Sequence, residues 1–457
     1  MKRKVLVCLL SLVMVSSFAK ENKAKSSTAS RFEKLELFNR VLHLIENQYY
    51  REVDTEKLIQ GAIKGMMGTL DPHSAYLDNK VFSKMQEDTK GEFGGLGIEV
   101  SQKDGMIVII TPILDTPAYK AGIKPGDKIV EINHESILGY QLEDVIDRMK
   151  GKTGTKIVLG IARDGADGII RFKIKRTLIK VSSVKRELVN DRYGYIRLIQ
   201  FQKGSGKGIE KAIKKLKIMA KKKKTQLEGI VLDLRNNPGG LLDEAVNVSS
   251  IFLKGGVVVS TEARDPKQKE IRYVKKTGHK ELKIPLVVLI NGSSASASEI
   301  VAGALQDSKR ALIVGEQSFG KGSVQSVAPL GKDQGVKLTI AQYMTPSNKK
   351  IQAIGIVPDI EIANLSSDWI MEHKQQGSYI RERDLKNHLN ATIESKEEKE
   401  SRLKHEKIER KERIAALNKK KKKKDDKGPI VYVAAEDYQI LQAIKILRSY
   451  KISREMK

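Results

Sequence analysis

Between about Val181 and Ile362, short and uninterrupted apolar runs alternate with helical stretches, and no other feature constrains the fold as much. The apolar runs are Gly229–Leu234, Ile284–Ile290 and Ala311–Val314, and the helical stretches are Leu241–Leu253 and Ser298–Gln306. Strands that are apolar throughout are buried on both faces, as happens when helices cover a largely parallel sheet. The segment therefore predicts an α/β core with a partly parallel sheet.

The residues before this core divide into two regions. Residues 32–85 carry apolar side chains at helical spacing, beginning with Phe32, Leu35 and Phe38. From Gly91 to about Thr177 the pattern changes to short strands separated by turns, with one amphipathic helix at Leu142–Met149. The strands are expected at Gly105–Ile110, Asp127–Ile132, Lys156–Ile161 and Ile169–Ile174.

Beyond the core the chain is strongly charged. Residues 375–428 hold 18 Lys/Arg and 11 Asp/Glu and end in six lysines, so this stretch is expected to be a solvated linker. The apolar face from Ile440 to Leu447 predicts a docking helix near the end. Together these shifts divide the chain into 1–19, 20–85, 86–178, 179–365 and 366–457.

The first 19 residues predict a secretory signal peptide. Lys2, Arg3 and Lys4 precede the apolar run Val5–Val15, and the small-x-small site Ser17–Ala19 follows. The run is too short for a comfortable membrane span, although an uncleaved anchor remains the alternative. Cleavage would remove Cys8, the only cysteine, and would exclude disulfides, cysteine zinc sites and cysteine nucleophiles. A secreted or periplasmic protein follows, for which nucleic acid is not an expected partner. The net charge of +28 fits an anionic partner or a Lys-rich organism equally well.

The segment Asn291–Ile300 (NGSSASASEI) places serines at a tight bend between a buried strand and a helix. Unpaired N–H groups at a helix start can stabilise an oxyanion beside an exposed hydroxyl, although a serine N-cap explains this segment equally well. A serine nucleophile needs a base. None of the seven histidines has a comparable glycine-framed setting, whereas Lys321 lies between two glycines after a buried strand. To accept a proton, its amine must be neutral, so burial must lower its pKa from about 10.4 towards 7–8.

Two other motifs compete for these residues. Gly315–Lys321 nearly completes a phosphate-binding loop, but Gly322 stands where Ser or Thr is needed, and a strand pattern follows instead of a helix. Ser182–Lys185 and Lys276–Gly278 suggest a penicillin-recognising enzyme, but no Ser-x-Asn lies between them. Both readings fail.

Three motifs resemble the carboxyl-terminal processing proteases, also called tail-specific proteases. They are Asn291–Ile300, Phe319–Gln325 and Asp233–Gly240 (DLRNNPGG), while Thr116–Asn133 resembles the PDZ domain of that family and Leu70–Leu77 a motif of its helical N-terminal region. The resemblance covers roughly residues 35–365 and implies a crotonase-like α/β protease core (179–365) with an inserted PDZ domain (86–178). The helical N-terminal region is then 20–85, and 366–457 is a charged linker with a C-terminal helix.

The resemblance also implies roles for individual residues. Ser296 is the expected nucleophile, Lys321 the general base, and Gln325 the group that orients the lysine. The amides of Gly240 and Ala297 would form the oxyanion hole. Asp307 matches an aspartate implicated in some members, but a helix-terminal role explains it at least as well. The glycine-rich turn of the PDZ domain would bind the terminal carboxylate of a peptide, and it comprises Gly94, Gly95, Leu96, Gly97 and Ile98.

The sequence thus predicts a secreted or periplasmic serine endopeptidase that cleaves proteins near their C-termini and needs neither metal nor nucleotide. Its partners would be protein substrates with apolar C-terminal tails. The helical faces Leu35–Ile45 and Ile440–Leu447 suggest a homodimer through the termini. A catalytically inactive PDZ scaffold is the alternative, and the lysine-rich tail is a candidate tether to an anionic envelope surface.

Overall fold

The computed structural model describes residues 30–363, 380–385, 388–389, 434 and 437–455, so the predicted signal peptide and the lysine run at 419–424 lie outside the described residues. The described residues form two units, one that ends at Leu70 and one that begins at Asp71. In the first, a helix at residues 30–48 is followed by α2 (Thr55–Gly68), whose N-cap Asp54 accepts a hydrogen bond from the Lys57 amide. The large apolar side chains of the helix at residues 30–48 are exposed, among them Phe32, Leu35, Phe38 and Val41.

The predicted α/β core is confirmed in the second unit. One six-stranded sheet has the order β10 (Val184–Val189), β11 (Tyr193–Leu198), β12 (Gly229–Asp233), β15 (Leu286–Ile290), β16 (Leu312–Gly315) and β19 (Ile360–Glu361). Only the pair β10–β11 is antiparallel, and the other four pairs are parallel. The carboxyl ends of β12 and β15 therefore meet at one edge of the sheet.

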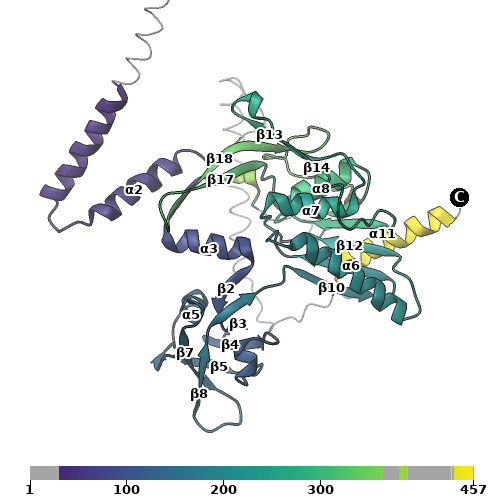
Figure 1. The fold of residues 1–457 in the computed structure, drawn as a ribbon, viewed down its shortest axis with the longest axis horizontal. Helices are drawn as coiled ribbons and strands as arrows, with labels where there is room; N and C mark the ends of the chain where they lie inside the picture. The colour runs from purple at the N-terminus through teal and green to yellow at the C-terminus, as the bar shows by residue number, and fades with distance from the viewer. Residues whose placement is uncertain (1–29, 364–379, 386–387, 390–433, 435–436, 456–457) are drawn as a thin grey trace, which may run out of the picture. The chain divides into compact units, whose positions relative to one another are not determined.

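Helices cover both faces of this sheet (Figure 1). On one face α6 (Ser205–Lys222), α7 (Leu242–Phe252) and α8 (Ala297–Asp307) contribute apolar side chains to the main core. On the other face, α11 (Tyr438–Glu455) packs on β12 and β15 through Ile440, Ala443, Ile444 and Leu447. The predicted docking helix is confirmed. Its apolar face is buried within this chain, so it is not available for the expected dimer contact.

A second, antiparallel sheet was not anticipated from the sequence. It has the order β1 (Ala75–Leu77), β18 (Gly335–Met344), β13 (Val257–Ala263) and β14 (Ile271–Tyr273), and β17 (Ser323–Pro329) also pairs with β18. Helix α3 (Asn79–Lys90) follows β1, and a short 3₁₀ turn, η1 (Pro266–Gln268), lies between β13 and β14. This sheet places Asp71–Ser74, which precede β1, beside Thr339 of β18.

The segment predicted as a PDZ domain has its own sheet and its own core. The strands are β3 (Ile98–Lys103), β4 (Met106–Pro112), β5 (Lys128–Ile132), β7 (Lys156–Ala162) and β8 (Ile169–Lys175), with β6 (Glu135–Ser136) paired to β5. Two helices, α4 (Pro117–Lys120) and α5 (Leu142–Met149), pack on this sheet. A two-stranded ladder of β2 (Glu92–Gly95) and β9 (Thr177–Lys180) encloses the segment in the chain. The predicted strands and the helix at Leu142–Met149 are confirmed.

None of the helices within the described residues is long and apolar enough to cross a membrane.

Candidate active site

Ser296 is held in a strained conformation at the entrance to α8. Its φ of 54° and ψ of −111° lie outside the regions that L-residues ordinarily occupy. Such backbone strain persists only where the surrounding structure over-determines it, and it concentrates at functional sites. The serine follows the bend after β15 and directly precedes the first residue of α8, so its half-buried side chain lies at the start of the helix. In this first turn the Ser298 and Glu299 amides already donate to the Ala295 and Ser296 carbonyls.

The bend around Ser296 is fixed by its neighbours. The Ser294 hydroxyl donates to the Leu234 carbonyl at 2.8 Å, and the Ser298 hydroxyl donates to the Asn237 carbonyl at 2.9 Å. The Ala295 amide also donates to the Asn237 carbonyl, at 3.0 Å. These bonds join the serine-rich bend to the loop after β12. The hydroxyls of Ser294 and Ser298 therefore stabilise the bend.

Two glycines of that loop lie against Ser296. A Cβ built on Gly239 would lie 2.9 Å from the Ser296 Cβ and 3.0 Å from the Ala297 nitrogen, so no side chain fits there. Gly240 has a φ of 137°, and a Cβ on it would lie 2.2 Å from the Phe201 carbonyl oxygen. The tight approach of the two segments thus requires glycine at both positions.

The amides of Ala297 and Gly240 are predicted to form an oxyanion hole, and this role stays a prediction. Ala297 is the first residue of α8, where an N–H group has no intrahelical acceptor. An isolated β-bridge pairs Phe201 with Gly240. Its two hydrogen bonds run from the Phe201 amide to the Gly239 carbonyl at 2.9 Å and from the Leu241 amide to the Phe201 carbonyl at 2.7 Å, so the bridge does not use the Gly240 N–H. Both amides belong to the segments that meet beside Ser296.

A fully buried carboxylate, Glu299, connects the serine to the lysine loop. Its Oε2 accepts hydrogen bonds from the backbone amides of Ser296 at 2.7 Å and Lys321 at 2.9 Å. Its Oε1 accepts from the Ser318 hydroxyl at 2.6 Å and the Gly320 amide at 2.7 Å. Because a single oxygen accepts from both, the backbone nitrogens of Ser296 and Lys321 lie close together.

Burial raises the pKa of Glu299 to about 7, although its four hydrogen bonds work in the opposite direction. The sequence reading missed this residue. A glutamate three positions after an N-cap serine is the usual signature of a capping box, and this pattern would have revealed the bond to Ser296. Nothing in the sequence indicated the bonds to residues 318–321.

The environment of Lys321 lowers the pKa of its side chain. Burial lowers the pKa of its ammonium group, and the nearby charge of Lys337 adds to that effect. Glu382, Glu299 and Asp71 oppose it, but the net direction is downward. The amine is therefore easier to deprotonate than an exposed lysine.

A partly buried pair next to the lysine loop, His73 and Glu382, was also missed. Glu382 of the 3₁₀ turn η2 (Glu382–Asp384) is fully buried, and its carboxylate lies 2.6 and 2.8 Å from Nε2 of His73. Gln352 donates to Glu382 at 2.9 Å and accepts from the Gly322 amide at 2.9 Å. The sequence predicted that residues 375–428 are a solvated, charged stretch. The number of charged residues in it gives no sign that one of them, Glu382, is linked through Gln352 to the lysine loop.

The side-chain amide of Gln325 donates its hydrogen bonds to residues other than the lysine. Its amide donates to the hydroxyls of Ser323 at 2.8 Å and Thr339 at 3.4 Å, and within the described residues no hydrogen bond joins it to Lys321. The register of β17 against β18 shifts between Val324 and Gln325. This irregularity cannot be read from the sequence, and the predicted orienting role of Gln325 is untested.

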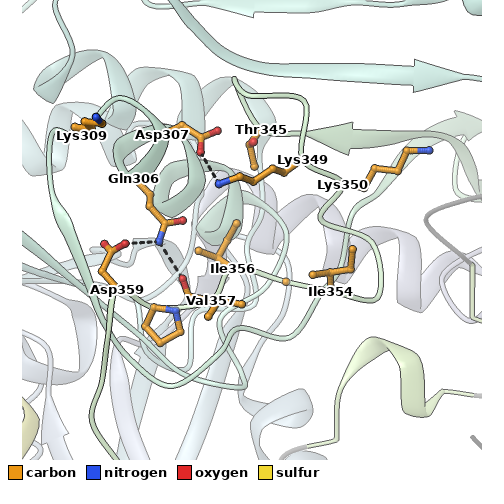
Figure 2. Close-up of a pocket in the computed structure, with 12 residues that line it drawn as sticks. Gln306, Asp307, Lys309, Thr345, Lys349, Lys350, Ile354, Ile356, Val357 and Asp359 are labelled. Carbon is orange, nitrogen blue, oxygen red and sulfur yellow. Dashed lines mark hydrogen bonds and ion pairs between the residues drawn. The ribbon is translucent and has the colours of Figure 1, made fainter.

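Asp307 lies at the opposite end of α8 from Ser296, about 16 Å away along the helix axis. Its carboxylate accepts from the Ser347 amide at 2.9 Å and hydroxyl at 2.7 Å, and lies 3.4 Å from the Lys349 amine. It lines a cavity of about 940 Å³ together with Gln306 and Lys349 (Figure 2). These contacts fit a helix-terminal role.

The residues predicted to bind a peptide terminus fall into two groups. Gly94 and Gly95 belong to the β2–β9 ladder, opposite Leu178 and Thr177. Leu96, Gly97 and Ile98 form the turn into β3, an edge strand of its sheet that pairs with β4. Half-buried apolar side chains of β3 and α5 lie over the same core, namely Ile98, Val100, Leu142 and Ile146.

Metal ligation was not expected. Across the part of the chain that the structure describes, no group of three or more His, Cys, Asp or Glu side chains is positioned to hold a metal ion.

Comparison with known proteins matches parts of the chain to three family models. The family model described as peptidase family S41 matches residues 192–362, and the model of a PDZ domain matches residues 108–163. A third model, the N-terminal domain of the activating protease CtpB, matches residues 11–81. The chain is therefore a serine-type peptidase with a PDZ domain.

The relatives define the family more narrowly. The carboxy-terminal-processing protease of Bartonella bacilliformis is 44% identical over 385 residues, which cover 84% of this chain and 86% of the relative. The carboxy-terminal processing protease CtpA of Bacillus subtilis is 37% identical and is covered to 70% by the match, which spans 74% of this chain. Among solved structures, a photosystem II D1 C-terminal processing protease matches with 29% identity and a TM-score of 0.41, over 72% of this chain and 92% of that protein. This chain belongs to the carboxy-terminal processing proteases.

Proposed function

We propose that the chain cleaves proteins near their C-termini through an acyl-enzyme on Ser296, with Lys321 as the general base. The observation that supports this best is the Glu299 carboxylate, which joins the strained serine and the lysine loop by backbone bonds of 2.7 and 2.9 Å. The lowered pKa of Lys321 supports the same assignment.

In the proposed reaction, the neutral amine of Lys321 takes the hydroxyl proton of Ser296 as Oγ attacks the peptide carbonyl carbon. The resulting oxyanion accepts hydrogen bonds from the amides of Gly240 and Ala297. When the tetrahedral intermediate collapses, the C–N bond breaks and the lysine ammonium gives its proton to the leaving amine. Water then hydrolyses the ester by the same sequence of proton transfers, and Ser296 is regenerated.

The decisive experiment replaces the serine. Ser296→Ala should abolish cleavage of an unstructured protein with an apolar tail, whereas Ser293→Ala should retain it, since the described contacts of Ser293 involve its backbone amide and not its hydroxyl. Product masses should place the cuts near the substrate C-terminus. Equal activity of Ser296→Ala and wild type would refute the assignment. A wild-type protein that binds tails without cleaving them would favour the inactive scaffold.

We further propose that the PDZ domain selects the tail. The edge strand β3 can pair with an extended peptide, and the turn Leu96–Ile98 can donate amides to its terminal carboxylate. Amidating the C-terminus of a peptide substrate should then raise KM and leave kcat unchanged. Leu142→Asp, at the half-buried apolar face of α5, should produce the same change with an unmodified substrate. Unchanged KM values in both cases would contradict this role.

Location and assembly are also proposals. Export with cleavage after Ala19 predicts that protein recovered from outside the cytoplasm begins at Lys20, which N-terminal sequencing tests. The exposed apolar side chains of the helix at residues 30–48 favour a homodimer through that helix. Light scattering should find a dimer that becomes a monomer in Leu35→Glu, and an unchanged mass would argue against this contact.

A further inference from the structure

Helix α6 has an outer face that is almost entirely lysine. The helix contains seven lysines and one glutamate, and Lys223 and Lys224 follow directly. Its buried face is formed by Ile209, Ile213, Leu216 and Ala220, which pack into the main core. At 100° per residue, the position opposite that face is occupied by Ile218, and the positions around it are occupied by lysines. These are Lys207, Lys211, Lys214, Lys215, Lys221 and Lys222, all of which are exposed. They are called the lysine face below.

The acidic groups near the lysine face do not neutralise it. Glu281 lies 2.5 Å from the Lys217 amine and Asp191 lies 3.7 Å from the Lys223 amine, both at the flanks of the helix. No ion pair joins any lysine of the lysine face to an acidic residue within the described residues. Glu210, the one acid of α6, lies about 80° from Ile218 around the helix axis. It stands three residues after Lys207 and four before Lys214, so a single acid faces the six lysines.

This arrangement opposes helix formation. Lys207, Lys211 and Lys215 follow one another at four-residue spacing, at which like charges on a helix surface repel. An ordinary solvent-facing helix relieves such repulsion with acids at the same spacing. A surface of negative charge would relieve it here, so the lysine face is complementary to a polyanion.

The centre of the lysine face identifies the kind of polyanion. Ile218, at this centre, is 56% exposed, and Met219, about 100° further around the helix at the edge of the face, is 39% exposed, although both are large apolar side chains. A soluble polyanion leaves such side chains in water, whereas a lipid headgroup layer accepts them between the acyl chains while lysines contact the phosphates. We propose that the lysine face docks the protease on the surface of an anionic lipid bilayer, with Ile218 inserted at its centre.

The test uses the full chain carrying Ser296→Ala, so that self-cleavage does not interfere, and co-sedimentation with vesicles of phosphatidylcholine alone or mixed with phosphatidylglycerol. The protein should bind only the mixed vesicles, and added salt should weaken binding. Replacing Lys211, Lys215 and Lys222 by Gln should lower the partition coefficient about a hundredfold, because each basic residue near such a surface contributes about a fivefold factor. Glutamine is a good helix former, so the fold should persist, which circular dichroism checks.

A matched control removes three exposed lysines from another region, by Lys103→Gln, Lys120→Gln and Lys175→Gln. It carries the same change in net charge and should bind mixed vesicles nearly as wild type does. If both triple variants lose binding equally, or if the α6 variant binds like wild type, the lysine face is not the docking surface. If a lysine run elsewhere in the chain binds the vesicles instead, the α6 variant should bind them as wild type does.

The apolar centre has its own test. Ile218→Ser should weaken binding to mixed vesicles severalfold and leave binding to heparin, a soluble polyanion, unchanged. If the substitution has no effect on vesicles while heparin binds as tightly as the mixed vesicles do, the face recognises a soluble polyanion and the membrane proposal is overturned. These outcomes do not depend on catalysis, so they are independent of the proposed proteolytic mechanism.

Discussion

The glycine beside the nucleophile offers the sharpest test of the active-site geometry. Gly239 has a φ of +101°, and a Cβ there would lie 2.8 Å from the Ala295 carbonyl oxygen and 2.9 Å from the Ser296 Cβ. Gly256 has nearly the same φ, +99°, but nothing lies within 4 Å of its virtual Cβ. Alanine at either site incurs a similar backbone strain, about 1–2 kcal/mol. Only Gly239→Ala also forces the Ser296 segment to move.

The added overlap at Gly239 should cost a further ~1–3 kcal/mol of the free energy of unfolding, measured in urea. Because the displaced atoms include the predicted nucleophile and the Ala297 amide, kcat/KM should fall about 100-fold or more. Gly256→Ala should lose only the strain energy and keep the wild-type kcat/KM. A folded Gly239→Ala protein with wild-type kcat/KM would refute the placement of Ser296 against this glycine, as would equal losses of activity in the two variants.

Three further predictions follow from the charges and the core. If Lys321 is the base, kcat/KM rises with pH as its amine loses its proton. The charge of Lys337 lowers the pKa of Lys321, so Lys337→Gln should shift the midpoint of the pH–rate profile upward. An unshifted midpoint would contradict this. Glu299 has its pKa raised from 4.5 to about 7, so the wild type should lose about 3 kcal/mol of stability between pH 4.5 and 8. The sign follows because burial favours the protonated form, and urea titrations should find no such loss in Glu299→Gln. Leu447 is 2% exposed and packs over Gly229 of β12. Leu447→Ala should lower the free energy of unfolding by about 2–5 kcal/mol, and a smaller loss in urea unfolding would show that α11 adds little to the core.

The sequence predicted those parts of the fold that depend on local periodicity. The apolar runs became β12, β15 and β16, and the amphipathic helix at Leu142–Met149 has the predicted bounds. The second sheet escaped prediction because β1 and β18 are more than 250 residues apart in the chain. Pairing over such a distance leaves no periodic trace in either segment.

The candidate site shows the same division. The bend at Asn291–Ile300 and the loop Asp233–Gly240 carry motifs, and their contacts place Ser296 beside the glycines as these motifs suggested. Glu299 lies within the first of these motifs, but its bond to the lysine loop, like the bond of Glu382 to His73, depends on burial and on partners from distant segments. The orientation of Gln325 depends on a register shift between two strands, which side-chain chemistry alone does not determine.

The position of α11 has a consequence for how the loop after β12 is held. This helix is the last one described in the chain, yet Arg235, in the loop that leads to Gly239, donates to Gln439 at 2.7 Å and to Asp437 at 3.1 Å. The loop that carries the two close-packed glycines is therefore braced by residues more than 200 positions further along the chain. Until the segment from Asp437 onward has folded against the sheet, Arg235 lacks these two acceptors and the face of β12 and β15 under α11 is uncovered. Completion of this loop thus depends on a long-range contact and not on the order of its own residues.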